Sequence, residues 1–203
     1  MKLTWYGHAC FKLETAEGSV VFDPYESNYL PNLTLPEICA DAVVCSHGHG
    51  DHSAAGLVTL TGNTPTFRMT QVACFHDEVM GLKRGKNLIT VIEAEGLRVA
   101  HFGDLGHELS RAQLRELGSI DIALMPVGGV YTVDARTAKM VCEKLLPSFI
   151  VPMHYKTGNA GLQNVAEVDD FLSLYHESKV LRLEGSTWNI GKTPRSVVVF
   201  ELC

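Results

Sequence analysis

The segment CSHGHGDHS, residues 45–53, is the most informative part of this sequence. It contains the pattern H-x-H-x-D-H, which places four potential metal ligands within six positions: His47, His49, Asp51 and His52. Alternate residues of an extended segment point the same way, so His47 and His49 can converge on one ion. Asp51 and His52 follow where the chain turns and can face a second ion. Because metal sites are the usual reason for such a cluster, the segment predicts a metal site rather than a polar loop.

The size and charge of the chain limit what can surround this segment. Its 203 residues suffice for one substantial core and are too few for two comfortable domains, so we expect a single domain over residues 1–203. The net charge of −6 argues against nucleic acid as a partner, since proteins that bind it usually present a basic face. The basic cluster KRGK at 83–86 is interpreted as a turn with solvated side chains.

The cellular location is predicted from what the sequence lacks. No stretch approaches the length of a transmembrane helix, and the start MKLTWYGHACF has no signal-peptide core, so we expect a cytoplasmic protein without a membrane partner. The six cysteines are scattered and form no C-x-x-C pair, which is typical of reduced, mostly buried thiols. Cys10 and Cys45 stand close to candidate site histidines, so a thiolate ligand for a soft metal stays open.

Alternating and β-branched segments separated by turn residues predict a β-rich chain. Strands are expected at 2–7, 10–15, 19–25, 42–47, 66–70, 71–76, 87–94, 97–104, 120–129, 149–154, 180–184 and 196–202. Helices are expected at 54–60, 108–117, 135–146 and 165–178. The order favours one α/β domain with helices outside two sheets.

Three further potential ligands lie just past apolar runs. His76 follows QVACF, Asp104 follows LRVAHFG and His154 follows FIVPM. The ends of strands are where α/β proteins usually build their sites. A lone histidine in such a place is more often structural, but the H-x-H-x-D-H pattern makes a shared metal site the better interpretation.

The motifs taken together resemble the metallo-β-lactamase fold superfamily. They are GHACF at 7–11, FDP at 22–24, H-x-H-x-D-H, a following histidine, GD at 103–104 and PMH at 152–154. The chain is most similar to the small stand-alone metal-dependent hydrolases, the ascorbate-6-phosphate lactonase-like and UPF0173-like proteins, over nearly its whole length. This resemblance implies a four-layered αββα sandwich with the metal ions at one edge of the two sheets.

The resemblance also implies a set of ligands for two divalent metal ions. The first ion would be held by His47, His49 and His76, the second by Asp51, His52 and His154, and Asp104 would bridge the two. His101, three residues before Asp104, competes with His76 for the first site. Imidazole and carboxylate ligands suit Zn²⁺, with Mn²⁺ and Fe²⁺ as alternatives.

Several neighbouring residues have expected supporting roles. By the same resemblance, Asp23 would lie beneath the metals and accept a hydrogen bond from a ligating histidine, although an Asp-Pro turn would explain it too. His8 would contact the substrate or a ligand. Tyr131, in the glycine-bearing loop GGVYT, can donate a hydrogen bond to a substrate oxygen. Lys156 could attract an anionic group, and Asp77 could orient a ligand or cap a turn.

The expected function is hydrolysis by a hydroxide that bridges two metal ions, with Asp51, His8 and Tyr131 as catalytic residues. The substrate would be a small, anionic metabolite with an ester, lactone or phosphodiester bond. The alternative is a mononuclear iron oxidoreductase resembling the persulfide dioxygenases of the same fold. His49 favours the hydrolases, since the flavodiiron-type relatives typically carry glutamate there. A non-catalytic metal-binding protein is a third hypothesis, and self-association into a homo-oligomer stays open.

Overall fold

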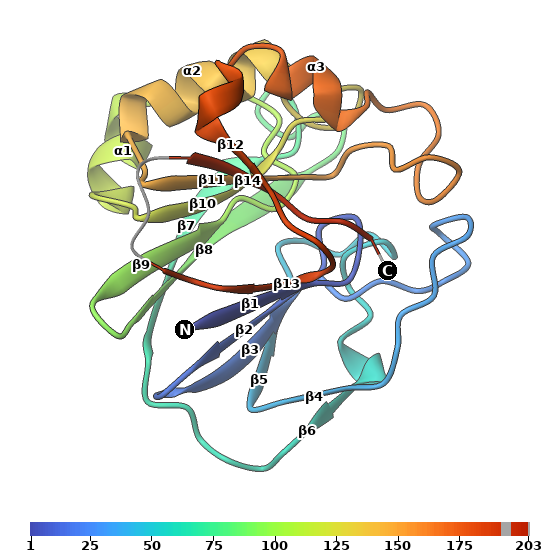
Figure 1. Cartoon of the computed structure of the whole chain (residues 1–203), viewed down its shortest axis with the longest axis vertical. Helices are drawn as coiled ribbons and strands as arrows, with labels where there is room; N and C mark the ends of the chain where they lie inside the picture. The colour runs from blue at the N-terminus through green and yellow to red at the C-terminus, as the bar shows by residue number, and fades with distance from the viewer. Residues whose placement is uncertain (192–195, 203) are drawn as a thin grey trace.

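The computed structural model describes residues 1–191 and 196–202 and contains two large sheets that face each other (Figure 1). The first sheet has the strand order β13-β1-β2-β3-β5. Its strands are β1 (Lys2–Trp5), β2 (Phe11–Thr15), β3 (Gly18–Phe22), β5 (Ala42–Val44) and β13 (Thr187–Asn189). Alternate residues such as Leu3 and Trp5 are buried against the second sheet, so the main core lies between the sheets.

The second sheet has the strand order β12-β14-β11-β10-β9-β8-β7. Its strands are β7 (Arg68–Phe75), β8 (Lys86–Ala94), β9 (Leu97–His101), β10 (Ile122–Pro126), β11 (Phe149–Met153), β12 (Val180–Arg182) and β14 (Ser196–Val199). Neighbouring strands from β9 to β12 pair in parallel, whereas β7, β8 and β9 pair antiparallel. Every residue of β10 and β11 is buried, because parallel strands in the middle of a sheet are covered on both faces.

Three helices cover the outer face of the second sheet (Figure 1). They are α1 (Arg111–Leu117), α2 (Ala135–Leu145) and α3 (Val168–Leu172). Helix α1 begins three residues later than predicted, after a capping box between Ser110 and Gln113, and its predicted end before Gly118 agrees with the structure. The prediction of a helix over 165–178 was too long, because the α-helix ends at Leu172 and a separate 3₁₀ turn follows at Glu177–Lys179.

The outer face of the first sheet is covered mainly by loops and a small two-stranded sheet. That sheet pairs β4 (Ile38–Ala40) with β6 (Val58–Leu60), and a 3₁₀ turn at Ala55–Leu57 precedes β6. The helix predicted over 54–60 is therefore wrong. Gly56 and the β-branched pair Val58 and Thr59 disfavour a helix, and Val58 is buried against Ile38 instead.

The strand directions bring distant parts of the sequence to one edge of the molecule. In the first sheet, β1, β3 and β5 run in the same direction. In the second sheet, β7, β9, β10 and β11 also share one direction. The loops that follow these strands carry the candidate site residues, except for His101, which is the last residue of β9. Among the described residues, no helix is long and apolar enough to cross a membrane.

Candidate metal centre

Six of the nine histidines and two aspartates converge at this edge. Each comes from a loop that follows a strand: His8 after β1, the H-x-H-x-D-H residues after β5, His76 after β7, Asp104 after β9 and His154 after β11. The structure thus brings together all seven predicted metal ligands and His8. Neither Cys10 nor Cys45 belongs to the groups of potential ligands found among the described residues.

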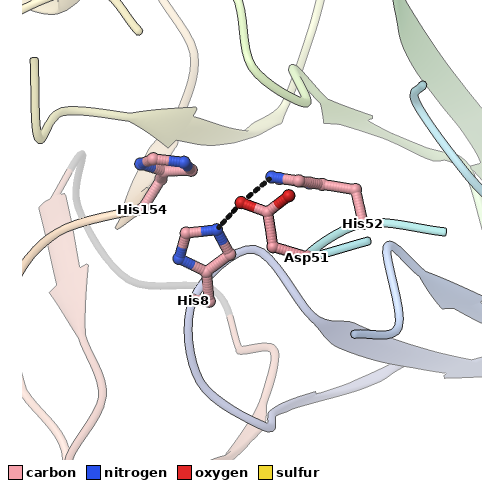
Figure 2. A group of neighbouring side chains, drawn as sticks. All are labelled: His8, Asp51, His52 and His154. Carbon is pink, nitrogen blue, oxygen red and sulfur yellow. Dashed lines mark ion pairs between the residues drawn. The ribbon is translucent and has the colours of Figure 1, made fainter. Parts of the chain in front are cut away.

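The potential ligands form three groups, and within each group the ligand atoms lie within 4.8 Å of one another. The first group is His47, His49 and His76. The second is His8, Asp51, His52 and His154, whose side chains point toward one another in Figure 2. The third joins His47, His52 and Asp104, and so links the other two. Because His47 and His52 each belong to two groups, the three groups form one continuous cluster of potential metal ligands.

Asp104 lies between the first two groups. Its Oδ2 atom is 3.1 Å from His76 Nε2 and 3.2 Å from His154 Nε2, and its Oδ1 atom is 3.2 Å from His52 Nε2. The backbone amide of Asp104 donates to the side chain of the buried Asn87 over 2.9 Å, which holds the loop in place. One carboxylate is therefore positioned to face both groups.

Asp23 lies directly beneath this cluster and is 1% exposed. It accepts hydrogen bonds from the Ser46 amide at 2.7 Å, the Ser46 hydroxyl at 2.6 Å and His52 Nδ1 at 2.8 Å. The Ser46 hydroxyl then accepts from His47 Nδ1 at 2.9 Å. In their neutral, metal-binding forms, both imidazoles would therefore carry their proton on Nδ1 and present the Nε2 lone pair to the centre. The contact between Asp23 and a site histidine agrees with the sequence prediction.

His76 and His101 differ in how their ring nitrogens are used. His76 Nδ1 donates to the Tyr131 carbonyl at 3.0 Å, which leaves Nε2 facing Asp104. His101 donates from Nε2 to the Ala9 carbonyl at 2.8 Å and accepts at Nδ1 from the Gly103 amide at 3.2 Å. Because both of its nitrogens are engaged with the backbone, His101 has none left for an ion.

Three of the site residues have a left-handed backbone conformation. The φ angles are 52° at His8, 44° at Asp23 and 54° at His154. Such a conformation costs a non-glycine residue roughly 1–2 kcal/mol, and aspartate and histidine are among the residue types that adopt it most often. This strain lies where the chain leaves a strand and turns a side chain into the centre.

The charges in the cluster depend strongly on one another. Burial disfavours the ionised form of Asp104, but the neighbouring His154 and His52 outweigh burial and hold its pKa well below its ordinary value. Burial also disfavours a charge on His52, yet Asp104 and Asp23 raise the His52 pKa well above its ordinary value. Burial and then His154 lower the pKa of His8 to about 3, so this imidazole is neutral at neutral pH. Without a bound ion His52 thus favours the protonated form, and a metal ion would displace the Nε2 proton on ligation.

Several buried polar atoms in the cluster have no hydrogen-bond partner in the part of the chain that is described. They are His8 Nε2, His52 Nε2, Asp104 Oδ1 and both ring nitrogens of His154. Buried polar groups are normally satisfied, and a cluster of exceptions that converges on one space indicates a bound ion. Nitrogen and carboxylate donors in this number suit a divalent transition metal. The residues therefore fit the metal ions that the sequence predicted.

Gly128 allows two loops of the centre to pack closely. A Cβ atom at this position would overlap the carbonyl oxygen of His154 and press on Val165. The first glycine of the GGVYT loop therefore makes room for the backbone of His154.

Replacing Gly128 with alanine is expected to lower the free energy of unfolding by about 1–3 kcal/mol and to reduce metal binding, because His154 must shift. Urea denaturation and elemental analysis measure the two effects. Gly56→Ala is the matched control, because a Cβ there meets nothing within 4 Å. Equal stability of the two variants would contradict this explanation.

A pocket opens over the cluster and is lined by Tyr29, His49, Asp51, His76, Arg84, Asp104, Tyr131 and Leu162, with Gly48 and Gly50. Tyr131 lies in this pocket, as its predicted contact with substrate requires, and its hydroxyl accepts from Asn164 at 2.7 Å. Lys156 lines a different pocket and is 3.5 Å from Glu167. The structure therefore does not place Lys156 beside the site.

Sequence reasoning missed Arg84, Tyr29, Ser46 and Asn87. Arg84 was assigned to a solvated turn with the rest of KRGK. Tyr29 lies in a proline-bearing loop without any pattern that relates it to the motif. Asn87 is the second residue of β8, and its contact with Asp104 depends on the pairing of β8 with β9. Such contacts carry no local signal.

Comparison with known proteins defines the class. A model of the beta-lactamase superfamily domain matches residues 2–154, and the chain belongs to the metallo-β-lactamase superfamily. A UPF0173 metal-dependent hydrolase of Methanoculleus marisnigri is 30% identical over 203 residues, covering 82% of this chain and 86% of the relative. The corresponding protein of Methanocaldococcus jannaschii is 29% identical over 187 residues, covering 76% and 84%.

A solved structure is similar over almost the whole chain. It is described as a Zn-dependent hydrolase of the metallo-beta-lactamase superfamily from Thermotoga maritima, and it is 38% identical. The similarity covers 98% of this chain and 97% of that one, with a TM-score of 0.78. The predicted fold and enzyme class are confirmed: the protein is a metal-dependent hydrolase.

Proposed function

We propose that this protein is a dinuclear metal hydrolase that cleaves an ester, lactone or phosphodiester bond in a small anionic metabolite. The observation that carries the proposal is the pair of ligand groups with Asp104 between them. A carboxylate that faces imidazoles of both groups is the arrangement expected of a bridging ligand. A single-ion site would have no need of the second group.

The distances support the ligand sets that the family resemblance implies. His47, His49 and His76 would hold one ion, and Asp51, His52 and His154 the other. Asp23, Ser46 and the Tyr131 carbonyl fix the ring orientations by accepting the Nδ1 protons of three of these imidazoles. When bound, two divalent ions supply an activated water and polarise the electrophilic oxygen of the substrate.

The remaining chemistry comes from side chains around the pocket. Asp51, which lines the pocket beside the second group, can accept a hydrogen bond from the attacking water and orient it. The Nε2 atom of the neutral His8 imidazole lies 3.4 Å from Asp51 Oδ2. We assign to His8 a contact with the reacting group of the substrate. The Tyr131 hydroxyl accepts from Asn164, so its own proton is free to be donated to a substrate oxygen.

Elemental analysis of the purified protein is the experiment that tests this proposal. About two Zn or Mn ions per chain are expected, together with hydrolysis of at least one substrate in a panel of lactones, aryl esters and phosphodiesters. One Fe ion per chain with oxygen uptake on a persulfide would contradict the proposal and favour the oxidoreductase hypothesis. Full metal loading without hydrolysis of any member of the panel would also count against it.

Removal of the metal is expected to destabilise the fold measurably. Ions that bind only the native state stabilise it, by about 2.7 kcal/mol when the free ion is present at 100 times its Kd. Treatment with a chelator should therefore lower the midpoint of thermal unfolding, and stoichiometric Zn²⁺ should restore it. An unchanged midpoint after verified metal removal would show that metal binding at the cluster does not stabilise the fold.

A further inference from the structure

We propose that Arg84 binds an anionic group of the substrate, a carboxylate or a phosphate, at the wall of the pocket that contains the candidate metal ligands. This inference rests on the proposed function only in taking this pocket as the substrate site. Besides its histidines, Arg84 is the one cationic residue among the described residues that line the pocket. A substrate with a charged group at some distance from its scissile bond could thus be held at both ends.

Arg84 is presented by a loop with a buried anchor. The Asp77 side chain is 1% exposed and accepts hydrogen bonds from four backbone amides, those of Val79, Gly81, Lys83 and Arg84, at 2.8–3.0 Å. Asp77 directly follows His76, which belongs to the first ligand group. The same short segment therefore fixes the position of a candidate metal ligand and of the arginine. Such preorganisation reduces the entropy lost when a ligand binds.

The Arg84 guanidinium is held against the opposite loop. Its Nη2 atom donates to the Val130 carbonyl at 2.9 Å, and its Cζ atom lies 5.7 Å from the centre of the Tyr131 ring. A guanidinium has five N–H donors, so this contact leaves several for a ligand. The hydrogen bond and the cation–π contact with Tyr131 restrict the orientation of the guanidinium, whose remaining donors suit a planar or tetrahedral oxyanion.

Arg84 has no carboxylate partner in the described part of the chain. Lys83, the preceding residue, is exposed and pairs with Glu78. A half-buried arginine that lacks such a partner and faces the pocket is suited to a charge-assisted hydrogen bond with an incoming anion.

The test compares Arg84→Gln with Lys83→Gln, a matched control that removes a positive charge from the neighbouring position. The substrates are mono-4-nitrophenyl succinate, which ends in a carboxylate, and the uncharged 4-nitrophenyl butyrate. Arg84→Gln should lower kcat/KM for the succinate ester by about 10- to 100-fold, mainly through KM, since a hydrogen bond to a charged group is lost. Turnover of the butyrate ester should stay within about twofold, and Lys83→Gln should resemble the wild type with both esters.

A binding measurement separates this inference from the proposed function. Inorganic phosphate and succinate are titrated calorimetrically into wild-type protein and both variants after metal removal. We expect Arg84→Gln, but not Lys83→Gln, to bind one or both anions about 10-fold more weakly than the wild type. The anion that shows the larger loss identifies whether Arg84 prefers phosphate or carboxylate. If the wild type hydrolyses neither ester, the proposed function is in doubt while the titration still decides the role of Arg84. Equal anion binding by all three proteins would overturn the inference.

Discussion

Asp104→Ala is expected to lower hydrolysis by at least about 10³-fold, which corresponds to roughly 4 kcal/mol of lost transition-state stabilisation. The Asp104 carboxylate lies within 3.2 Å of an imidazole nitrogen of His52, His76 and His154. Without it, the two ligand groups lose the one oxygen ligand that faces both. We therefore expect bound metal to fall from about two ions per chain to one or none.

Elemental analysis and turnover of the best substrate measure this effect. The fold should persist, because the backbone amide of residue 104 still donates to Asn87. Asp169→Ala is the control, since it removes a carboxylate that pairs with Arg182 on the exposed surface. A variant at position 104 that keeps two ions and activity within tenfold of the wild type would exclude a bridging role.

Asp23→Asn is expected to weaken metal binding by about 10- to 100-fold although it changes no ligand and almost no volume. The carboxylate accepts from the Ser46 amide through one oxygen and from the Ser46 hydroxyl and His52 Nδ1 through the other. An amide cannot accept at both ends. One orientation places its NH₂ group against the Ser46 N–H, and the other forces His52 to move its proton to Nε2, which then cannot bind a metal.

The same substitution should lower the free energy of unfolding by about 1–3 kcal/mol, because a buried donor loses its acceptor. Zn²⁺ titration against a competing chelator and urea denaturation measure the two effects. Asp41→Asn is the matched control: Asp41 also accepts from a serine amide and hydroxyl, but it precedes β5, at the end of that strand away from the centre. Similar losses of metal affinity in both variants would argue against the role of Asp23.

The segments that follow clear local patterns were predicted well. The hairpin between β8 and β9 turns at Glu95 and Gly96, which both have positive φ. This turn lies between the strands that were expected at 87–94 and 97–104. Helix α1 and the buried strands β10 and β11 also form where they were predicted, although α1 begins at Arg111 rather than at 108 and β10 spans only Ile122–Pro126 of the predicted 120–129. The wrong helix at 54–60 and the overlong one at 165–178 are short segments whose structure depends on packing rather than on periodicity.

The local sequence alone determined the class of the protein and most of the candidate centre. H-x-H-x-D-H is a contiguous motif, and the later ligands each follow a strand that its own residues specify. The tertiary structure decided the rest: it engages His101 with the backbone and places Arg84 rather than Lys156 in the pocket. These outcomes depend on strand order and on loops that meet across the sheets, and contacts between residues so far apart in the chain leave no pattern in the sequence around them.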